Sequence, residues 1–370
     1  MSLWNVSVNM SMQTQAQTEW CWAATTVSAA TYLNSADAGT QCELVGACLS
    51  QQCCADGSTA ACNVPWYLGK ALAHTGNLDV GPIVPPAFAD IVTILASGLP
   101  LGARIGWQGG GGHFVAIVGA DSVNVRLNIL DPRGTTEDFS DADFRQAYRN
   151  IGTWTHAYKM KRNQIAAEAS GGGPAVGVPV PVSSQLSNIV GDDPYGRKLE
   201  SMQRLLQHPM RRPFPHLGPS ALKAYDVYFI GLNDAAGESP LKAARLSGRR
   251  TIVQGVDGLT MAEVTVNPDG TEREPHLSTG HPVDSIAAIL QQSADAIGQP
   301  ETVTRYLSVS ALSLRALWLI SKDGSNTIIP ITPAPPPLTA GRRYSGAAFE
   351  QVLRPLAATR ITIDVGLEEP

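Results

Sequence analysis

The sequence predicts an α+β protein of two domains joined by a linker. Three observations lead to this prediction: a length of 370 residues, a Gly/Pro/Ser-rich segment near the middle, and helical patterns that precede strand patterns. A chain of this length exceeds what one hydrophobic core usually serves. Helices followed by runs of strands favour an α+β layout over alternating βαβ units.

The predicted linker is segment 164–190, which reads QIAAEASGGGPAVGVPVPVSSQLSNIV. Its three consecutive glycines, spaced prolines and paired serines leave it without a periodic apolar face. The unit before it, residues 1–163, holds all six cysteines and six of the seven tryptophans. The unit after it, residues 191–370, has no cysteine. We therefore predict two separate domains.

The first unit begins with helices. Segment 21–34, CWAATTVSAATYLN, is rich in small residues and predicts a closely buried helix. Segment 87–98 has apolar residues at helical spacing and ends at Gly98, where a terminal glycine is expected. Short apolar runs bounded by glycine or turn residues then predict strands at 99–107, 113–120 and 124–131.

The second unit also mixes helices and strands. Helices are predicted at 193–207, 282–297 and 345–357. Strands are predicted at 224–232, 251–257, 261–266, 314–320, 327–331 and 361–365. This α+β unit resembles no family that would indicate its function.

Composition excludes some partners and locations. The net charge of -5 leaves no basic surplus for phosphates, so we expect no nucleic-acid partner. No apolar run reaches the roughly 18 residues of a membrane span, and the N-terminus MSLWNVSVNM lacks the charged and apolar regions of a secretory signal. We expect no membrane association, and either a cytoplasmic location or export without such a signal.

Five cysteines crowd into a short stretch of the first unit: Cys42, Cys48, Cys53, Cys54 and Cys62. Because five is odd, this cluster forms at most two internal disulfides and leaves one thiol. The cluster has no CxxC pair and no histidine, which argues against zinc. Disulfides, buried thiols and a zinc site stay open as alternatives.

Cys21 is the candidate nucleophile because it lies where the first helix begins. A thiol has an ordinary pKa of about 8.5, and a helix N-terminus or a neighbouring imidazolium lowers that pKa. His113 is the best placed histidine, since four glycines precede it and an apolar strand follows. The alternatives are a packed core thiol between Trp20 and Trp22 and a satisfied core histidine.

A hairpin would supply the third member of a catalytic triad. If 113–120 and 124–131 pair around residues 121–123, His113 lies directly opposite Asp131. A carboxylate there would hold the imidazole tautomer, although Asp131 before Pro132 could also merely end a strand. Alternation predicts one shared face made of His113, Val115, Ile117, Val125, Leu127, Ile129 and Asp131.

An oxyanion hole needs hydrogen-bond donors aimed at the developing negative charge. The backbone N–H of Cys21 is one candidate donor. Gln13, Gln15 and Gln17 each offer a side-chain amide as another, and the residues alone leave this choice open.

Together these residues resemble the papain-like cysteine peptidases, and most of all the bacterial branch that includes effector proteases of plant pathogens. The resemblance covers about residues 1–160. It rests on Gln15 six residues before Cys21, WCWAA at 20–24, GGHFVAIVG at 111–119 and LDP at 130–132. It implies a two-lobed fold, with a helical lobe, an antiparallel β lobe and the active site between them.

The resemblance also implies roles. Cys21 would be the nucleophile, His113 the general base and acid, Asp131 the residue that orients it, and Gln15 an oxyanion donor. The activity implied is hydrolysis of peptide bonds in protein or peptide substrates, with no metal and no cofactor. The alternatives are amide transfer or deamidation by the same triad, or a catalytically silent binding module.

The sequence departs from plant papain in three respects. The orienting residue is Asp rather than Asn, no tryptophan follows it closely to shield its hydrogen bond, and we expect no inhibitory prodomain before the catalytic unit. The first two departures fit the bacterial branch. The third leaves control of activity unexplained, and we expect that the C-terminal domain could supply it within the same chain.

Overall fold

The computed structural model describes residues 6–34, 38–163, 224–255, 258–267, 269–273, 276–297 and 302–365. This part of the chain mixes helices and strands, as the predicted fold class requires. The predicted linker at 164–190 and the predicted helix at 193–207 lie outside the described residues. Among the described helices, none combines the length and the apolar character needed to cross a bilayer.

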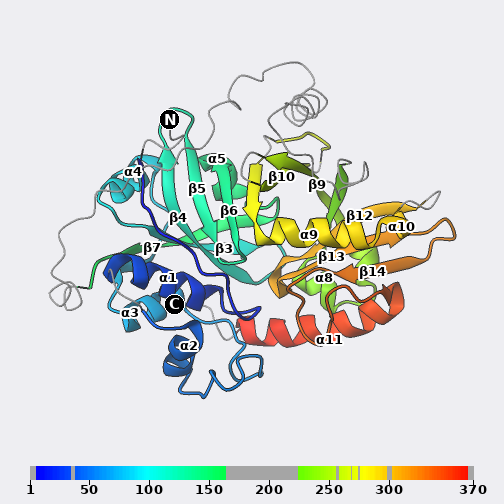
Figure 1. The fold of residues 1–370 in the computed structure, drawn as a ribbon, viewed down its shortest axis with the longest axis horizontal. Coiled ribbons are helices and arrows are strands. Elements are labelled where there is room, and N and C mark those ends of the chain that lie inside the picture. Colours follow the sequence, from blue (N-terminus) through cyan, green and yellow to red (C-terminus); the bar gives the residue numbers. More distant parts are fainter. Residues whose placement is uncertain are drawn as a thin grey trace.

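Residues 6–163 form helices packed beside an antiparallel sheet (Figure 1). The helices are α1 (Cys21–Asn34), α2 (Gln41–Leu49), α3 (Leu68–His74), α4 (Phe88–Ala96) and α5 (Asp141–Gln146). The strands are β1 (Val6–Ser7), β2 (Leu78–Ile83), β3 (Leu101–Trp107), β4 (Gly112–Asp121), β5 (Arg126–Asp131), β6 (Thr135–Ser140) and β7 (Gly152–Met160). The predicted helices α1 and α4 and strands β3, β4 and β5 are confirmed, whereas β2, β6 and β7 were not predicted.

Residues 224–365 add a second group of helices and strands. The helices are α8 (Leu232–Ala236), α9 (His281–Gln292), α10 (Ala294–Ile297) and α11 (Gly346–Val365), with 3-10 turns η2 (Pro240–Ala243) and η3 (Ser310–Leu312). The strands are β8 (Tyr225–Phe229), β9 (Arg245–Gly255), β10 (Gly258–Thr265), β11 (His276–Gly280), β12 (Val303–Val309), β13 (Leu314–Ile320), β14 (Asn326–Pro330) and β15 (Tyr344–Ser345).

The strand predicted at 361–365 is wrong, because α11 continues through it. Phe349, Leu353 and Ala357 are buried on one side of this helix, and Arg360 extends the same buried stripe. Their spacing of four, four and three residues follows the helical period. Tertiary packing of this stripe therefore overrides the β propensity of the sequence ITIDV.

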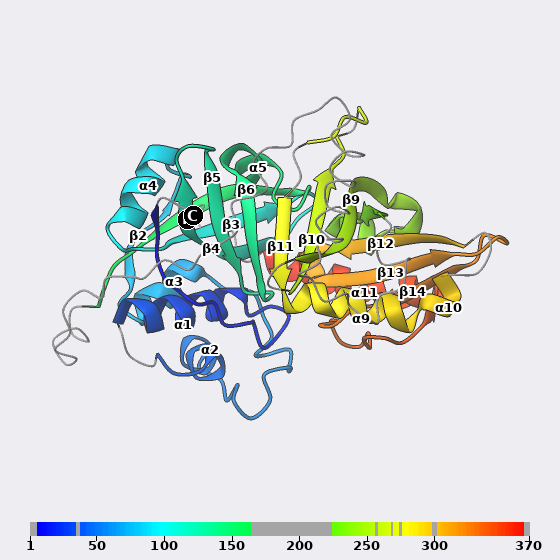
Figure 2. The same ribbon diagram turned by 45° about the horizontal axis from the view of Figure 1, so that its top comes forward.

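The strands join into one sheet that runs through both parts of the chain. In order, its main path is β15, β14, β13, β12, β8, β9, β10, β11, β6, β5, β4, β3, β7 and β2. The two parts meet where β11 pairs antiparallel with β6, with Leu277 opposite Asp138 and Gly280 opposite Thr135 (Figure 2). One hydrophobic core likewise includes Trp22 from the first part and Phe349 from the second.

Helix α1 lies at the centre of the N-terminal part. Its first ten residues are all buried, and it packs against α2, α3 and β4. Its alanines allow this close approach, and Ala23, Ala24, Ala29 and Ala30 have no exposed surface. Trp22 packs on Trp66 with ring centroids 5.1 Å apart. The start of α1 is therefore fixed against the sheet, as a reactive residue there would require.

The hairpin of β4 and β5 forms in a different register from the predicted one. Ile117 pairs with Ile129, which is two residues away from its predicted partner. The pairing is irregular after Ile117, and Ala120 then pairs with Leu127, which is three residues away from its predicted partner. The turn spans residues 122–125. Val125 lies there with a φ of 52° and is 46% exposed, so its predicted inward orientation is wrong.

Candidate active site

Cys21 is the first residue of α1 and is buried, with 9% of its surface exposed. The flanking tryptophans anchor it, since the Trp20 indole N–H donates to the Cys62 carbonyl at 2.8 Å and that of Trp22 donates to the Val64 carbonyl at 3.1 Å. Both indoles thus hold the start of the helix against one loop. The two tryptophans therefore serve packing on either side of the thiol.

His113 and Asp131 are in direct contact. His113 Nε2 lies 2.8 Å from Asp131 Oδ1, and the side chains are 2% and 0% exposed. A register shift of two residues keeps both side chains on the same face of the sheet, because the side-chain period of a strand is two. The two residues are therefore diagonal neighbours rather than the directly opposite pair predicted.

The thiol of Cys21 lies against the strand that carries His113. The backbone N–H of Phe114, the residue after His113, donates to the Cys21 sulfur. Helix α1 thus places the candidate nucleophile against strand β4, which carries the candidate base, while β5 supplies the carboxylate. Of the three residues, His113 and Asp131 are in direct contact.

Asp131 has other partners in addition to His113. The Arg133 backbone N–H donates to Oδ1 at 2.7 Å, the Tyr148 hydroxyl donates to Oδ2 at 2.8 Å, and Arg149 Nη2 lies 3.3 Å from Oδ2. Burial alone would raise the pKa of this carboxyl, but His113, Arg149 and Arg133 outweigh it and hold the pKa well below its ordinary value. Asp131 is therefore ionised and fixed in orientation.

Trp107, at the end of β3, covers His113 and was missed by sequence reasoning. The two rings stack with centroids 5.9 Å apart and planes inclined by 21°. Because Ile105 pairs with His113, Trp107 is the diagonal neighbour of the histidine on the other flanking strand. Pairing the predicted strands 99–107 and 113–120 around the four glycines would have found it.

In this arrangement the thiol and the imidazole are both neutral. Burial raises the pKa of Cys21 to about 11, against the hydrogen bond from Phe114. Burial lowers the pKa of His113 to about 4, although Asp131 acts in the opposite direction. The low-dielectric surroundings therefore favour a proton on sulfur and an uncharged imidazole.

Gln15 is the buried glutamine of the three candidates, at 7% exposed. Its backbone N–H donates to the Pro132 carbonyl at 2.6 Å, which ties it to the Asp131 turn. Its side-chain Nε2 donates to the carbonyls of Gln17 and Thr18, both at 2.8 Å. To act as an oxyanion donor, Gln15 has to release one of these carbonyls.

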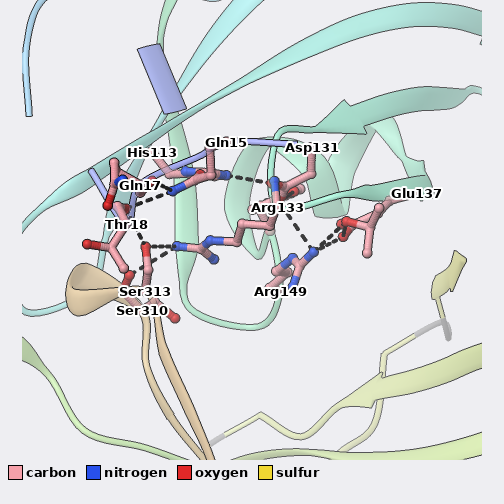
Figure 3. A network of polar contacts seen from close by, with 12 residues as sticks. Gln15, Gln17, Thr18, His113, Asp131, Arg133, Glu137, Arg149, Ser310 and Ser313 are labelled. Atoms are coloured by element: carbon pink, nitrogen blue, oxygen red, sulfur yellow. Dashed lines mark hydrogen bonds and ion pairs between the residues drawn. The ribbon is translucent and has the colours of Figure 1, made fainter. Parts of the chain in front are cut away.

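The C-terminal part of the chain reaches the same region (Figure 3). The Ser313 hydroxyl donates to the Thr18 carbonyl at 3.1 Å, and Arg133 Nη2 donates to the Ser310 carbonyl at 3.1 Å. On α11, Arg360 Nη1 lies 3.4 Å from a carboxylate oxygen of Glu19, two residues before the thiol. The η3 turn and α11 therefore contact the loop that leads into Cys21.

The cysteine cluster forms two disulfides, Cys42–Cys54 and Cys53–Cys62, and leaves Cys48 as a half-buried thiol. These bonds crosslink the loop whose Cys62 carbonyl receives the Trp20 indole. Within the described residues, no group of three or more His, Cys, Asp or Glu side chains is arranged to hold a metal ion. The disulfide alternative is thus the one found, and the loop serves as support for the start of α1.

Comparison with known families agrees with this geometry. Residues 3–149 match the family described as papain-like cysteine protease AvrRpt2, and the match spans Cys21, His113 and Asp131. No curated protein matches the chain. This match over residues 3–149 indicates a papain-like cysteine protease.

Proposed function

We propose that the protein hydrolyses peptide bonds of protein or peptide substrates through a Cys21–His113–Asp131 triad. Residues 1–163 would form the peptidase domain, with Cys21 on a helical lobe and the other two residues on a β lobe. The observation that carries the proposal is the 2.8 Å contact of His113 Nε2 with Asp131 beside a helix-start thiol.

The proposed reaction has two halves. Asp131 accepts a hydrogen bond from His113 Nε2–H, which leaves Nδ1 free to take the thiol proton from Cys21. The sulfur attacks the peptide carbonyl carbon, the C–N bond breaks, and His113 returns the proton to the leaving amine. Water, deprotonated by His113, then attacks the acyl-enzyme and releases the acid and the free thiol.

The developing negative charge on the carbonyl oxygen also needs donors. The backbone N–H of Cys21 and the side-chain amide of Gln15 are the proposed pair. Since Gln15 now donates to Gln17 and Thr18, substrate binding would have to exchange one of these carbonyls for the substrate oxygen.

A thiol-directed activity probe tests the assignment of the nucleophile. We expect the wild type to label at Cys21 and to cleave a peptide library, and Cys21→Ala to do neither while keeping its unfolding temperature. Cys48→Ala is the matched control, because this second free thiol lies outside the triad. Cleavage by Cys21→Ala at an appreciable rate would show that another residue is the nucleophile.

The same experiment separates the alternative functions. Hydrolysis yields a new carboxyl and a new amine, amide transfer joins the acyl group to an added amine, and deamidation converts a glutamine or asparagine side chain to an acid. Mass spectrometry of the products distinguishes these three outcomes. A binding module without chemistry would give no labelling and no product.

We also propose that the C-terminal part, within residues 191–370, restrains the peptidase by covering it. The support is the burial of Cys21 and His113, together with the contacts of Ser313 with Thr18 and of Arg360 with Glu19. Arg360 additionally donates to the Ala311 carbonyl at 3.2 Å, so it connects α11, η3 and the loop before the thiol.

Arg360→Ala tests this restraint, with the exposed Arg354→Ala of the same helix as control. We expect Cys21 in Arg360→Ala to be alkylated roughly 10-fold faster, which corresponds to a loss of about 1.4 kcal/mol of docking free energy. Arg360 also lowers the pKa of Cys21, so its loss by itself would slow alkylation. Slower or unchanged alkylation would therefore contradict the restraint.

A further inference from the structure

A small buried cavity lies where the two parts of the chain meet, apart from the thiol. Its volume is about 20 Å³. Arg133 and Arg149 line it from the N-terminal part, and Arg250, Tyr306 and Arg315 line it from the C-terminal part. Nothing in the proposed peptidase mechanism uses these C-terminal side chains.

Each of these five side chains carries a buried hydrogen-bond donor that has no partner in the described part of the chain. The donors are Arg133 Nε, Arg149 Nε, Arg250 Nη1, Arg315 Nε and the Tyr306 hydroxyl. All five residues are about nine-tenths buried or more, between 3% and 9% exposed. A buried donor without an acceptor costs free energy, and native proteins leave few of them.

The charges around the cavity do not balance. Arg149 pairs with Asp131 and Glu137, and Arg250 pairs with Glu263, so four guanidinium groups face three carboxylates. Arg315 forms no ion pair within the described residues, and its Nη2 donates to the Thr332 carbonyl at 3.1 Å. A buried cation without a counter-charge is strongly unfavourable.

Arg315 is a buried guanidinium group whose surroundings are positively charged. Burial lowers its pKa to about 10, and the positive charges of Arg149, Arg133 and Arg250 act in the same direction. One negative charge placed among these groups would offset the repulsion and accept hydrogen bonds from several of the free donors.

We propose that this cavity is a binding site for one monovalent inorganic anion of halide size, with chloride as its occupant. A volume of about 20 Å³ suits one particle about as large as a water molecule. A water molecule would accept only two of the free hydrogen bonds and would leave the positive charge in place.

The site goes beyond the proposed peptidase function, because it is a structural ligand site that joins two parts of the chain. Arg133 and Arg149 reach it from two turns whose residues hold Asp131, whereas Arg250 and Arg315 reach it from β9 and β13. Anion binding would therefore stabilise the docked arrangement of the two parts.

Bromide diffraction tests occupancy directly. Crystals of the full chain grown in sodium bromide are expected to show an anomalous peak in the cavity within hydrogen-bond distance of the arginines. A cavity without anomalous signal would overturn the proposal, and so would a peak confined to exposed side chains.

Thermal unfolding tests affinity independently of protease activity. At constant ionic strength, replacing sodium gluconate by sodium chloride is expected to raise the unfolding temperature by about 2 °C per tenfold chloride once the site saturates. Arg315→Met should abolish this rise, whereas Arg245→Met, at a 63% exposed arginine, should retain it. Equal curves in chloride and gluconate for the wild type would overturn the proposal; if Arg315→Met does not fold, the bromide result decides.

Discussion

Trp107 lies face to face with His113, with the two ring planes inclined by only 21°. The indole covers one side of the imidazole, and Asp131 lies at its Nε2 edge. Trp107 and Asp131 come from the strands on either side of β4, so the hairpins β3–β4 and β4–β5 together fix the ring. A tryptophan that precedes the histidine in the chain thus covers the imidazole, whereas no tryptophan follows Asp131 closely.

Trp107→Ala should raise the pKa of His113 from about 4 towards its ordinary value, because burial is the main cause of the low pKa. We expect the acid limb of the pH profile of kcat/KM to move to higher pH, with little change at pH 7, because a pKa of up to 6.5 still leaves most of the imidazole neutral there. Trp107→Phe, which retains an aromatic ring, is the control. An unmoved acid limb in the alanine variant would mean that the indole does not set the environment of the imidazole.

Asp131→Ala should reduce kcat strongly, yet less completely than Cys21→Ala, since the thiol and the oxyanion donors remain. Asp131→Asn should retain more activity than Asp131→Ala, because an amide oxygen still accepts the Nε2–H of His113. Steady-state kinetics of the three variants on one peptide substrate checks this order. Equal losses in the Ala and Asn variants would indicate that Asp131 acts only through the fold.

Gln15→Ala should lower kcat by roughly 10- to 1000-fold, the range found for removal of one oxyanion donor. Gln17→Ala is the matched control, because this half-buried glutamine contributes only its backbone carbonyl to the contact with Gln15. Kinetics under saturating substrate separates the effect on kcat from binding. If Gln17→Ala were the impaired variant, the donor would lie two residues further along the chain.

Acid should destabilise the protein through two buried histidines. The pKa values of His113 and His276 are about 4 in the folded chain, lowered chiefly by burial from an ordinary 6.5. The unfolded chain therefore binds more protons between these values, so this stability is fully present above pH 6.5 and is lost as pH falls towards 4.

Within that window the free energy of unfolding should fall by up to about 1.4 kcal/mol per pH unit for each histidine. Urea unfolding of the wild type at several pH values measures the slope. His276→Gln should reduce it, and the exposed His74→Gln should leave it unchanged. A slope that His276→Gln does not alter would show that His276 titrates normally in the folded chain.

Much of the candidate site could be predicted from sequence because its parts lie in locally regular segments. The alanine-rich helix places Cys21 at its start, and an even register shift still leaves His113 and Asp131 on one face. The register itself was not predictable, since the irregularity after Ile117 and the left-handed Val125 lengthen the turn. Strand pairs without such irregularities follow from alternation alone.

Contacts between distant parts of the chain could not be predicted from local sequence patterns. Tyr148, Arg149 and Arg133 surround Asp131, but no spacing in the sequence indicates that they converge. The helical stripe that extends to Arg360 was present, yet the β-branched residues around it favoured a strand. Long-range partners of this kind depend on tertiary packing, which single-sequence patterns do not encode.

The pairing of β6 with β11 has a practical consequence for anyone who shortens the chain. A fragment that ends near residue 163 would keep Cys21, His113 and Asp131 but would leave the backbone donors and acceptors of Thr135 to Asp138 facing water along β6. An uncovered strand edge is a template for pairing with another molecule. Such a fragment is therefore expected to self-associate, and its low recovery would reflect a bare sheet edge rather than a failed protease fold.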